Sequence, residues 1–221
     1  MVELGALPAD QRLDLSEYDR EHWEARWAQA LRGHGDRVAQ RPPNAHLTAE
    51  VSALPPGRAL DAGCGHGSDT IWLAARGWRV TAVDFAATAL AYARSTAEAV
   101  GPDVAGRIDW VEADLGTCTP PRDAFDLVVC IYVHAAGPVE ELVQRMAGRV
   151  ARGGTLFLVG HRPVDPATGA ATAAAGQAQV SVAAALASLD PAWWELLVAE
   201  ERPRPAVGSG VDAVIRARRR S

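Results

Sequence analysis

Hydrophobic positions in the middle of the chain fall into two alternating patterns. Short apolar runs at residues 58–63, 78–84, 125–133 and 155–160, together with the alternating stretch at 107–114, predict strands, and helices are predicted between them. The run FDLVVCIYV at 125–133 is continuously apolar after Asp126, which is typical of a central strand covered on both faces. This β-α-β-α order predicts a parallel sheet with helices on both sides.

Glycine and proline mark the ends of the expected helices. We expect core helices at residues 68–76, 86–100 and 138–151. The glycines that follow them are Gly77, Gly101 and the pair Gly153-Gly154. Glycine commonly terminates a helix, so these residues are interpreted as helix ends.

The two ends of the chain differ from this core. Residues 16–32 predict an amphipathic helix, and residues 45–54 predict a second, shorter one. Residues 193–204 and 211–219 predict two strands that form an antiparallel hairpin. Residues 165–176 are rich in Ala, Gly and Thr and predict a loop. The sequence has no internal repeat and no pattern that predicts a second domain.

Composition narrows the class of protein. A length of 221 residues suits one α/β domain, and a net charge of −5 argues against a nucleic-acid protein, which usually carries a basic face. The cysteines Cys64, Cys118 and Cys130 are too scattered for a disulfide framework or a metal site, so no metal is expected. The acidic start of the chain lacks the apolar region of a secretory signal, and no long apolar run predicts a membrane span. We therefore expect a cytoplasmic protein, and the Lys-free, Ala- and Arg-rich composition suggests a bacterial one.

A glycine-rich stretch, Asp61-Ala-Gly-Cys-Gly-His-Gly67, follows the first core strand. Glycine permits positive φ and lets a ligand approach the backbone closely. The turn lies at the carboxyl end of a strand, where open α/β sheets bind ligands. The spacing of Gly63, Gly65 and Gly67, with Ser68 next, departs from the G-x-G-x-x-G fingerprint of dinucleotide sites.

Acidic residues end the next two strands. Asp84 ends the 78–84 run, where a carboxylate can accept hydrogen bonds from both hydroxyls of a ribose. Asp114 can accept from the amino group of adenine, and Leu115 can offer a backbone N–H to the ring; alternatively, Asp114 only caps a turn. Asp61 can contact the ligand or order the glycine loop. Together these residues indicate a site for adenosine joined to an amino acid, as in S-adenosylmethionine (SAM).

At these motifs the chain resembles class I SAM-dependent methyltransferases. The segments ALDAGCGHGSDTIWLAARGWRVTAVDFAATALAYAR, VEADL and FDLVVCIYVH carry the resemblance, which covers about residues 44–160. The W-x-x-R-W pattern upstream and the Pro-Asn pair before the first strand are similar to the tellurite-resistance and thiopurine methyltransferase-like enzymes of small molecules.

The resemblance implies a fold. We expect a Rossmann-like, doubly wound sheet of seven mostly parallel strands, with an antiparallel C-terminal hairpin strand and N-terminal lid helices. The single domain, residues 1–221, would comprise a lid at 1–54, a SAM-binding core at 55–160, and a substrate-side loop or helix with the hairpin at 161–221.

The resemblance also implies cofactor-binding residues, some on the core loops and one on the lid. They are Trp27, Asp61, Gly63, Cys64, Gly65, Asp84, Phe85, Asp114, Leu115 and Ile131. Cys64 is interpreted as a packing residue rather than a nucleophile. An aromatic lid residue such as Trp27 would favour the sulfonium by cation–π attraction, or would only pack the helix onto the domain.

The substrate side is expected beyond the fourth and fifth core strands. His134 and His161 follow those strands and are the candidate catalytic and substrate-binding residues, because a histidine can act as a base near neutral pH. Each is otherwise a loop histidine bonded to backbone. Arg162 could bind an anionic substrate or simply be solvated. Tyr18 and Trp23 could contact the substrate from the lid or only pack the helix onto the domain. His46 has no comparable placement.

Several functions fit this pattern. The first is methyl transfer from SAM to a small molecule by in-line displacement, with S-adenosylhomocysteine released and the acceptor atom (O, N, S or halide) left open. The alternatives are a SAM-binding protein that does not methylate, an NAD(P)-dependent oxidoreductase and a methyltransferase of macromolecules. We expect a small-molecule acceptor, no nucleic-acid or membrane partner, and a monomer or homodimer.

Overall fold

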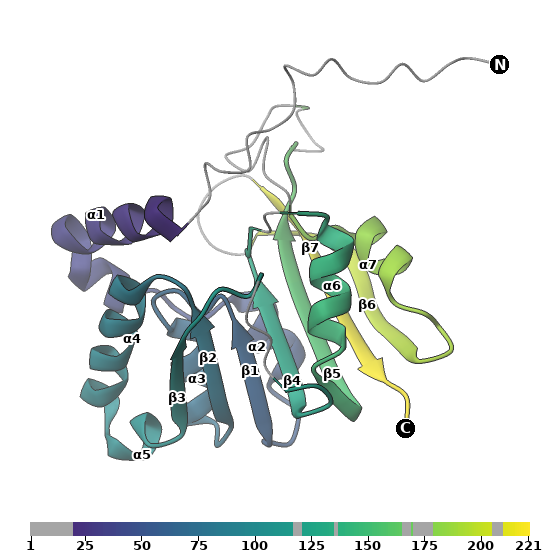
Figure 1. Cartoon of the computed structure of the whole chain (residues 1–221), viewed down its shortest axis with the longest axis horizontal. Coiled ribbons are helices and arrows are strands. Elements are labelled where there is room, and N and C mark those ends of the chain that lie inside the picture. Colours follow the sequence, from purple (N-terminus) through teal and green to yellow (C-terminus); the bar gives the residue numbers. More distant parts are fainter. Residues whose placement is uncertain (1–19, 117–120, 135–136, 165–168, 170–178, 205–209) are drawn as a thin grey trace.

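A seven-stranded sheet forms the centre of the computed structural model, which describes residues 20–116, 121–134, 137–164, 169, 179–204 and 210–221 (Figure 1). The strands are β1 (Arg58–Ala62), β2 (Arg79–Asp84), β3 (Ile108–Glu112), β4 (Phe125–Ile131), β5 (Val150–His161), β6 (Trp194–Pro203) and β7 (Val211–Arg219). Their order is β3-β2-β1-β4-β5-β7-β6. Only β7 runs antiparallel to its neighbours β5 and β6, which confirms the predicted sheet and terminal hairpin.

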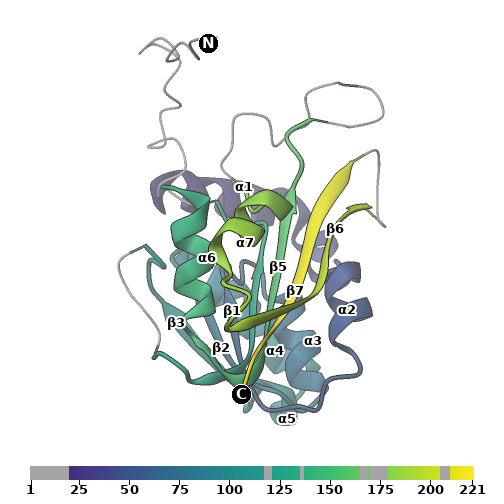
Figure 2. The ribbon, with the colours of Figure 1, turned by 90° about the vertical axis from the view of Figure 1, so that its right-hand side faces the viewer.

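Helices cover both faces of this sheet. They are α1 (Arg20–Ala39), α2 (Ala45–Val51), α3 (Ser68–Ala75), α4 (Ala87–Val100), α5 (Pro102–Ala105), α6 (Val139–Ala147) and α7 (Val182–Ser188). Leu47 of α2 and Leu73 of α3 belong to one buried cluster, whereas Met146 of α6 and Ala185 of α7 belong to the other. Figure 2 shows these two pairs of helices on opposite sides of the sheet.

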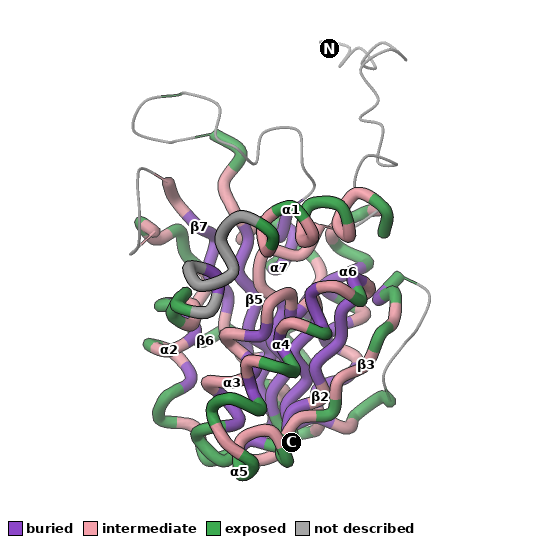
Figure 3. Tube along the Cα trace, turned by 90° about the vertical axis from the view of Figure 1, so that its left-hand side faces the viewer, coloured by how far each residue is buried: buried purple, intermediate pink, exposed green. Residues whose placement is uncertain are grey.

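Strand β4 is apolar without alternation because both of its faces are buried. Leu127 and Val129 of β4 pack into the cluster under α2 and α3, while Val128 and Cys130 pack into the cluster under α6 and α7. Each of these four positions is therefore buried on one face or the other. Figure 3 shows in purple that the interior of the sheet is buried. No helix in the described part of the chain is long and apolar enough to cross a membrane.

The structure corrects two element boundaries. Helix α6 ends at Ala147, and β5 already begins at Val150. Gly153 and Gly154, which the pattern indicated as a helix end, lie within the strand. Gly153 has φ +77°, and the pairing with β4 shifts register there, so these glycines mark an irregularity of the sheet.

The N-terminal helix also differs from its prediction. Helix α1 continues to Ala39, seven residues beyond the expected end at residue 32. The start of the predicted helix, residues 16–19, lies outside the described residues, as does all of the predicted loop 165–176 except Gly169. Helix α1 lies at the carboxyl-end edge of the sheet, above α4 (Figure 1).

Candidate functional site

The glycine loop joins β1 to α3 at the carboxyl edge of the sheet. Gly63, Gly65 and Gly67 all adopt positive φ, at +78°, +52° and +81°. A Cβ atom on Gly67 would lie 2.8 Å from Cβ of Ala93, and one on Gly65 would lie 2.9 Å from the ring of Trp27. Both the backbone conformation and the close neighbours therefore require glycine at these two positions.

The N–H groups of this loop point toward its own chain. Those of Gly63 and Cys64 donate to the carbonyl of Val83, at 2.8 and 3.0 Å. That of Gly65 donates to Oδ2 of Asp84, at 2.8 Å. A phosphate cradle instead directs loop N–H groups at its ligand. This stretch of backbone is therefore arranged differently from a phosphate-binding loop.

Three carboxylates gather around the loop. Asp84 also accepts from the N–H of Ala86, Asp61 accepts from the hydroxyl of Thr70 at 2.5 Å, and Asp69 accepts from the N–H of Asn44 at 2.6 Å. Burial, reinforced by the neighbouring Asp69, raises the pKa of Asp61 to about 7. Burial likewise raises the pKa of Asp69 to about 6, and it also raises the pKa of Asp84. Such a cluster favours a cationic ligand, which would stabilise the ionised acids.

The segment after β3 lies beside Asp84. The N–H of Ala113 donates to the carbonyl of Asp84 at 3.0 Å. Asp114 is exposed, and its Oδ1 accepts from the N–H of Gly116 at 2.7 Å, so it caps a turn. Leu115 is buried. Their proposed contacts with adenine remain predictions.

The other predicted cofactor residues in the core border the same edge. Phe85 follows Asp84 and is half-buried. Ile131 ends β4, pairs with Val159 of β5 and is also half-buried. Cys64 is buried, and burial raises the pKa of its thiol well above the ordinary value. The thiol stays protonated, which agrees with a packing role.

Helix α1 spans the edge from the glycine loop to the substrate side. Glu24 accepts from an N–H at the start of α4, with Oε2 at 3.2 Å. Trp27 packs against Gly65, and the ring of Trp23 lies 5.2 Å from that of His134. Both tryptophans thus contact the predicted site, whereas Tyr18 lies outside the described residues.

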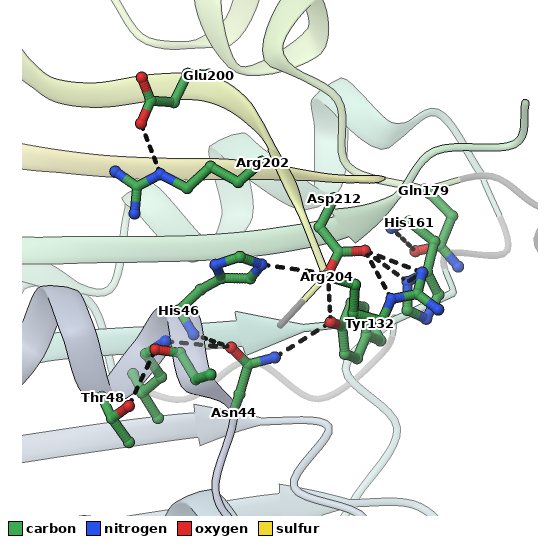
Figure 4. Close-up of polar contacts among 12 residues, drawn as sticks. Asn44, His46, Thr48, Tyr132, His161, Gln179, Glu200, Arg202, Arg204 and Asp212 are labelled. Carbon is green, nitrogen blue, oxygen red and sulfur yellow. Dashed lines mark hydrogen bonds and ion pairs between the residues drawn. The ribbon is translucent and has the colours of Figure 1, made fainter. Parts of the chain in front are cut away.

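A buried carboxylate joins several polar side chains on the predicted substrate side (Figure 4). Asp212, at the start of β7, is fully buried. Its Oδ2 accepts from the hydroxyl of Tyr132 at 2.7 Å, and its Oδ1 lies 3.0 Å from Nδ1 of His161 and 3.0 Å from Nη2 of Arg204. Burial alone would raise the pKa of Asp212, but these hydrogen bonds outweigh burial and lower it to about 2. Asp212 is therefore ionised.

Tyr132 connects this carboxylate to the N-terminal helices. Its φ of +55° is unusual for a bulky residue, and its ring stacks on His161 with centroids 3.7 Å apart. Asn44 caps α2 and donates to the tyrosine oxygen at 3.3 Å. Burial and Asp212 raise the pKa of Tyr132, so its phenol remains a neutral donor.

Gln179 links the two predicted histidines. Its Oε1 accepts from the backbone N–H of His161 at 3.3 Å, and its Nε2 lies 2.9 Å from Nδ1 of His134. A Cβ on Gly160 would collide with the carbonyl of Val180, so the glycine allows this segment to lie against β5. Burial, with smaller contributions from nearby cationic groups, lowers the pKa of His134 to about 4.

Two outcomes were not expected from the sequence. Arg162 forms an ion pair with Glu201 of β6 at 3.1 Å. His46, which had no expected role, lies with Nε2 3.4 Å from Oδ2 of Asp212. Four further polar residues of the site were not predicted from the sequence: Asn44, Tyr132, Gln179 and Arg204. The one local signal was Asp212 itself, an acid at the start of the otherwise apolar run VDAVI.

Known proteins with sequences similar to this chain include methyltransferases. Residues 59–154 match the family model described as a methyltransferase domain. An uncharacterized methyltransferase of Mycobacterium tuberculosis strain H37Rv is 37% identical over 120 residues, covering 52% of this chain and 58% of that protein. The ribosomal RNA small subunit methyltransferase C of Chromohalobacter salexigens is 38% identical over 105 residues, covering 46% of this chain and 31% of that protein. The chain therefore spans only part of the curated relatives it matches.

A solved structure shares the fold over nearly the whole chain. The N-methyltransferase NodS from Bradyrhizobium japonicum WM9, in complex with S-adenosyl-L-homocysteine, superposes with a TM-score of 0.64 at 19% identity. The match covers 91% of this chain and 98% of that one. The sheet order and the antiparallel β7 are thus those of a Rossmann-like methyltransferase fold.

Proposed function

We propose that this chain, whose residues 59–154 match a methyltransferase domain, transfers the methyl group of SAM to a small-molecule acceptor and releases S-adenosylhomocysteine. One observation carries the proposal. The glycine loop is surrounded by Asp61, Asp69 and Asp84, while the N–H groups of Gly63, Cys64 and Gly65 are bonded within the chain. That environment suits a ligand with ammonium and sulfonium charges better than a pyrophosphate.

The residues present fit SAM in three places. Asp84 accepts from the N–H of Gly65 at Oδ2 and from that of Ala86 at Oδ1, and a carboxylate has further acceptor capacity for a ribose hydroxyl. The close backbone of Gly63 and Gly65, with Asp61 behind it, would hold the methionine part. Phe85, Asp114, Leu115 and Ile131 would border the adenosine, and Trp27 would cover it from α1.

The substrate would lie beyond β4 and β5, near His134 and His161. Bound SAM supplies an electrophilic methyl carbon on a positively charged sulfur. The protein then has to hold the acceptor in line with that bond and keep water away, which is where much of the rate enhancement arises. Trp23, Arg162 and Tyr18 are proposed to contact the acceptor, with His134 or His161 taking its proton where it has one.

A small-molecule acceptor is supported by the acidic net charge of −5 and by the short chain. The loose resemblance to the tellurite-resistance and thiopurine methyltransferase-like group points the same way. The acceptor atom, O, N, S or halide, remains to be found, and a bacterial, cytoplasmic enzyme is part of the same proposal.

Calorimetry with the full chain tests the cofactor first. SAM and S-adenosylhomocysteine should bind, while NADH should not. Methyl transfer is then followed with radiolabelled SAM against thiols, phenols, halides and tellurite. Absence of SAM binding at millimolar concentration would overturn the proposal, and NADH binding would favour the oxidoreductase. SAM binding without transfer to any acceptor would favour a SAM-binding protein that does not methylate.

A further inference from the structure

The two histidines of the substrate side are held by chemically opposite partners. His161 faces a carboxylate through Nδ1, whereas His134 faces an amide nitrogen through Nδ1. We propose that Asp212 and Gln179 are positioning residues that fix these rings in opposite tautomers, so that His161 presents a base and His134 presents an N–H donor. The proposal deepens the function above and rests on it for the identity of the reaction.

The neighbours of Gln179 fix the orientation of its side-chain amide. A backbone N–H can only donate, so the side-chain atom 3.3 Å from the N–H of His161 is the amide oxygen. The amide nitrogen of Gln179 therefore faces His134, with its closest contact, 2.9 Å, to Nδ1. This contact outweighs the longer one of 3.4 Å to Nε2.

The amide of Gln179 fixes the tautomer of His134. An amide nitrogen only donates, so Nδ1 of His134 must carry a lone pair. Burial lowers the pKa of His134 to about 4, so the ring is neutral at neutral pH. A neutral imidazole that accepts at Nδ1 carries its proton on Nε2. His134 therefore acts as a donor through Nε2.

Nδ1 of His161 has two competing neighbours. Oδ1 of Asp212 lies at 3.0 Å and Nη2 of Arg204 at 2.7 Å. The carboxylate can only accept and the guanidinium can only donate, so one ring nitrogen cannot satisfy both. A lone pair 3.0 Å from a buried, ionised carboxylate is repelled, whereas an N–H there makes a charge-assisted hydrogen bond.

Arg204 does not depend on the ring nitrogen of His161 as its acceptor. The guanidinium already donates to Oδ1 of Asp212 from Nη2 at 3.0 Å, and its side chain is 29% exposed to solvent. Asp212 has no exposed surface. We therefore place the proton of His161 on Nδ1, toward Asp212, which leaves the lone pair on Nε2. This is the arrangement in which a carboxylate orients a histidine as a base.

The assignment gives each ring a place in methyl transfer to a hydroxyl or amine. The lone pair of the acceptor atom forms the new bond to the methyl carbon, and the electrons of the carbon–sulfur bond remain on sulfur. The proton of the acceptor passes to Nε2 of His161, and Asp212 stabilises the resulting imidazolium. His134 donates from Nε2 to orient the acceptor.

Nitrogen-15 NMR on the full chain with labelled histidine tests this directly, because two-bond couplings distinguish the tautomers. His134→Gln and His161→Gln spectra assign the signals. In the unmodified chain we expect Nδ1–H for His161 and Nε2–H for His134. The same tautomer in both rings, or Nε2–H in His161, would overturn the proposal.

Single substitutions distinguish the effects of Asp212, Gln179 and Arg204 on the two rings. Asp212→Asn should turn His161 to Nε2–H, Gln179→Leu should increase the Nδ1–H form of His134, and Arg204→Met should leave His161 unchanged. Tyr132→Phe is the matched control, since it removes the hydrogen bond to the other carboxylate oxygen of Asp212, Oδ2, and should move neither ring. A change in His161 with Arg204→Met but not with Asp212→Asn would assign the ring to Arg204 and overturn the proposal. If Asp212→Asn does not fold, the unmodified chain and the Arg204 and Gln179 variants still decide.

SAM binding, measured by calorimetry on the same samples, keeps the two proposals apart. A chain that binds SAM but shows other tautomers contradicts only the positioning roles. A chain with the expected tautomers that does not bind SAM contradicts only the proposed function. With an accepted substrate in hand, Asp212→Asn should lower kcat at least tenfold while SAM affinity stays within twofold.

Discussion

The carboxyl edge of the sheet has two halves that treat buried aspartates in opposite ways. At the β1–β2 end, burial and Asp69 raise the pKa of Asp61 to about 7. At the β5–β7 end, Tyr132, His161 and Arg204 surround the fully buried Asp212, and its pKa falls to about 2. Burial is common to both residues, so the partners decide the outcome. The β1–β2 half, here called the acidic half, has no cationic partner for its buried carboxylates among the described residues. In the β5–β7 half, here called the neutralised half, Arg204 and the hydrogen-bond donors around Asp212 balance its charge.

The largest effect should come from breaking the neutralised half. Asp212→Ala leaves Arg204, His161 and the hydroxyl of Tyr132 without their shared acceptor, and should lower the free energy of unfolding by about 3–5 kcal/mol. Urea denaturation at pH 8 measures this loss. Asp61→Asn is the contrasting variant from the other half. Because burial disfavours the Asp61 carboxylate in the folded state at pH 8, this variant should not lower the free energy of unfolding, and a gain in stability is expected. Equal losses in both variants would contradict the comparison.

The next effect concerns cofactor binding at the acidic half. Asp84→Ala should weaken SAM binding by about 1.5–3 kcal/mol, the scale of hydrogen bonds to a charged group. Glu112→Ala, at the end of the neighbouring strand β3, is the control, because its exposed carboxylate pairs with Arg20. Calorimetry should show the loss in the first variant only. Unchanged affinity in Asp84→Ala would show that the site is misplaced.

A smaller effect is expected from pH. Asp61 in the empty protein binds a proton up to about pH 7, and a cationic ligand favours its ionised form. SAM affinity should therefore rise with pH between 5.5 and 7, by at most about tenfold per pH unit. Titrations across this range measure the slope. Asp61→Asn should flatten it, and a slope that persists in this variant would assign the proton to another group.

The smallest effect should come from the lid. Trp27→Ala removes an aromatic face from beside the glycine loop and should weaken SAM binding by about 0.5–2 kcal/mol. Trp193→Ala is the control, since Trp193 is exposed and lies next to the start of β6. If calorimetry gives the same small change for both, Trp27 packs the helix without contacting the cofactor.

The sequence predicts the acidic half far better than the neutralised half. Asp61, the glycines and Asp84 lie at the ends of consecutive strands, so their proximity follows from the βαβ order. Asn44, Tyr132, Gln179 and Asp212 come from distant segments, and β7 enters the sheet between β5 and β6. Neither periodicity nor spacing reports which residues such an insertion brings together.

One misread boundary has a similar cause. Gly153-Gly154 has the composition of a helix end, and Gly153 does adopt positive φ. The tertiary pairing of Val150 with Phe125 nevertheless extends β5 across it. Local propensity was overridden by pairing with a strand about 25 residues away.

The absence of a side chain at Gly160 has a consequence for how this protein can vary. The backbone of Val180 occupies the space that a Cβ atom would need, and Gln179 is the preceding residue. A single added methyl group on β5 would displace the connection between the two histidines while leaving every polar side chain of the site unchanged. The relation between the rings is thus vulnerable to mutation at a residue that carries no chemistry, so relatives with the same polar residues can differ in activity through this position alone.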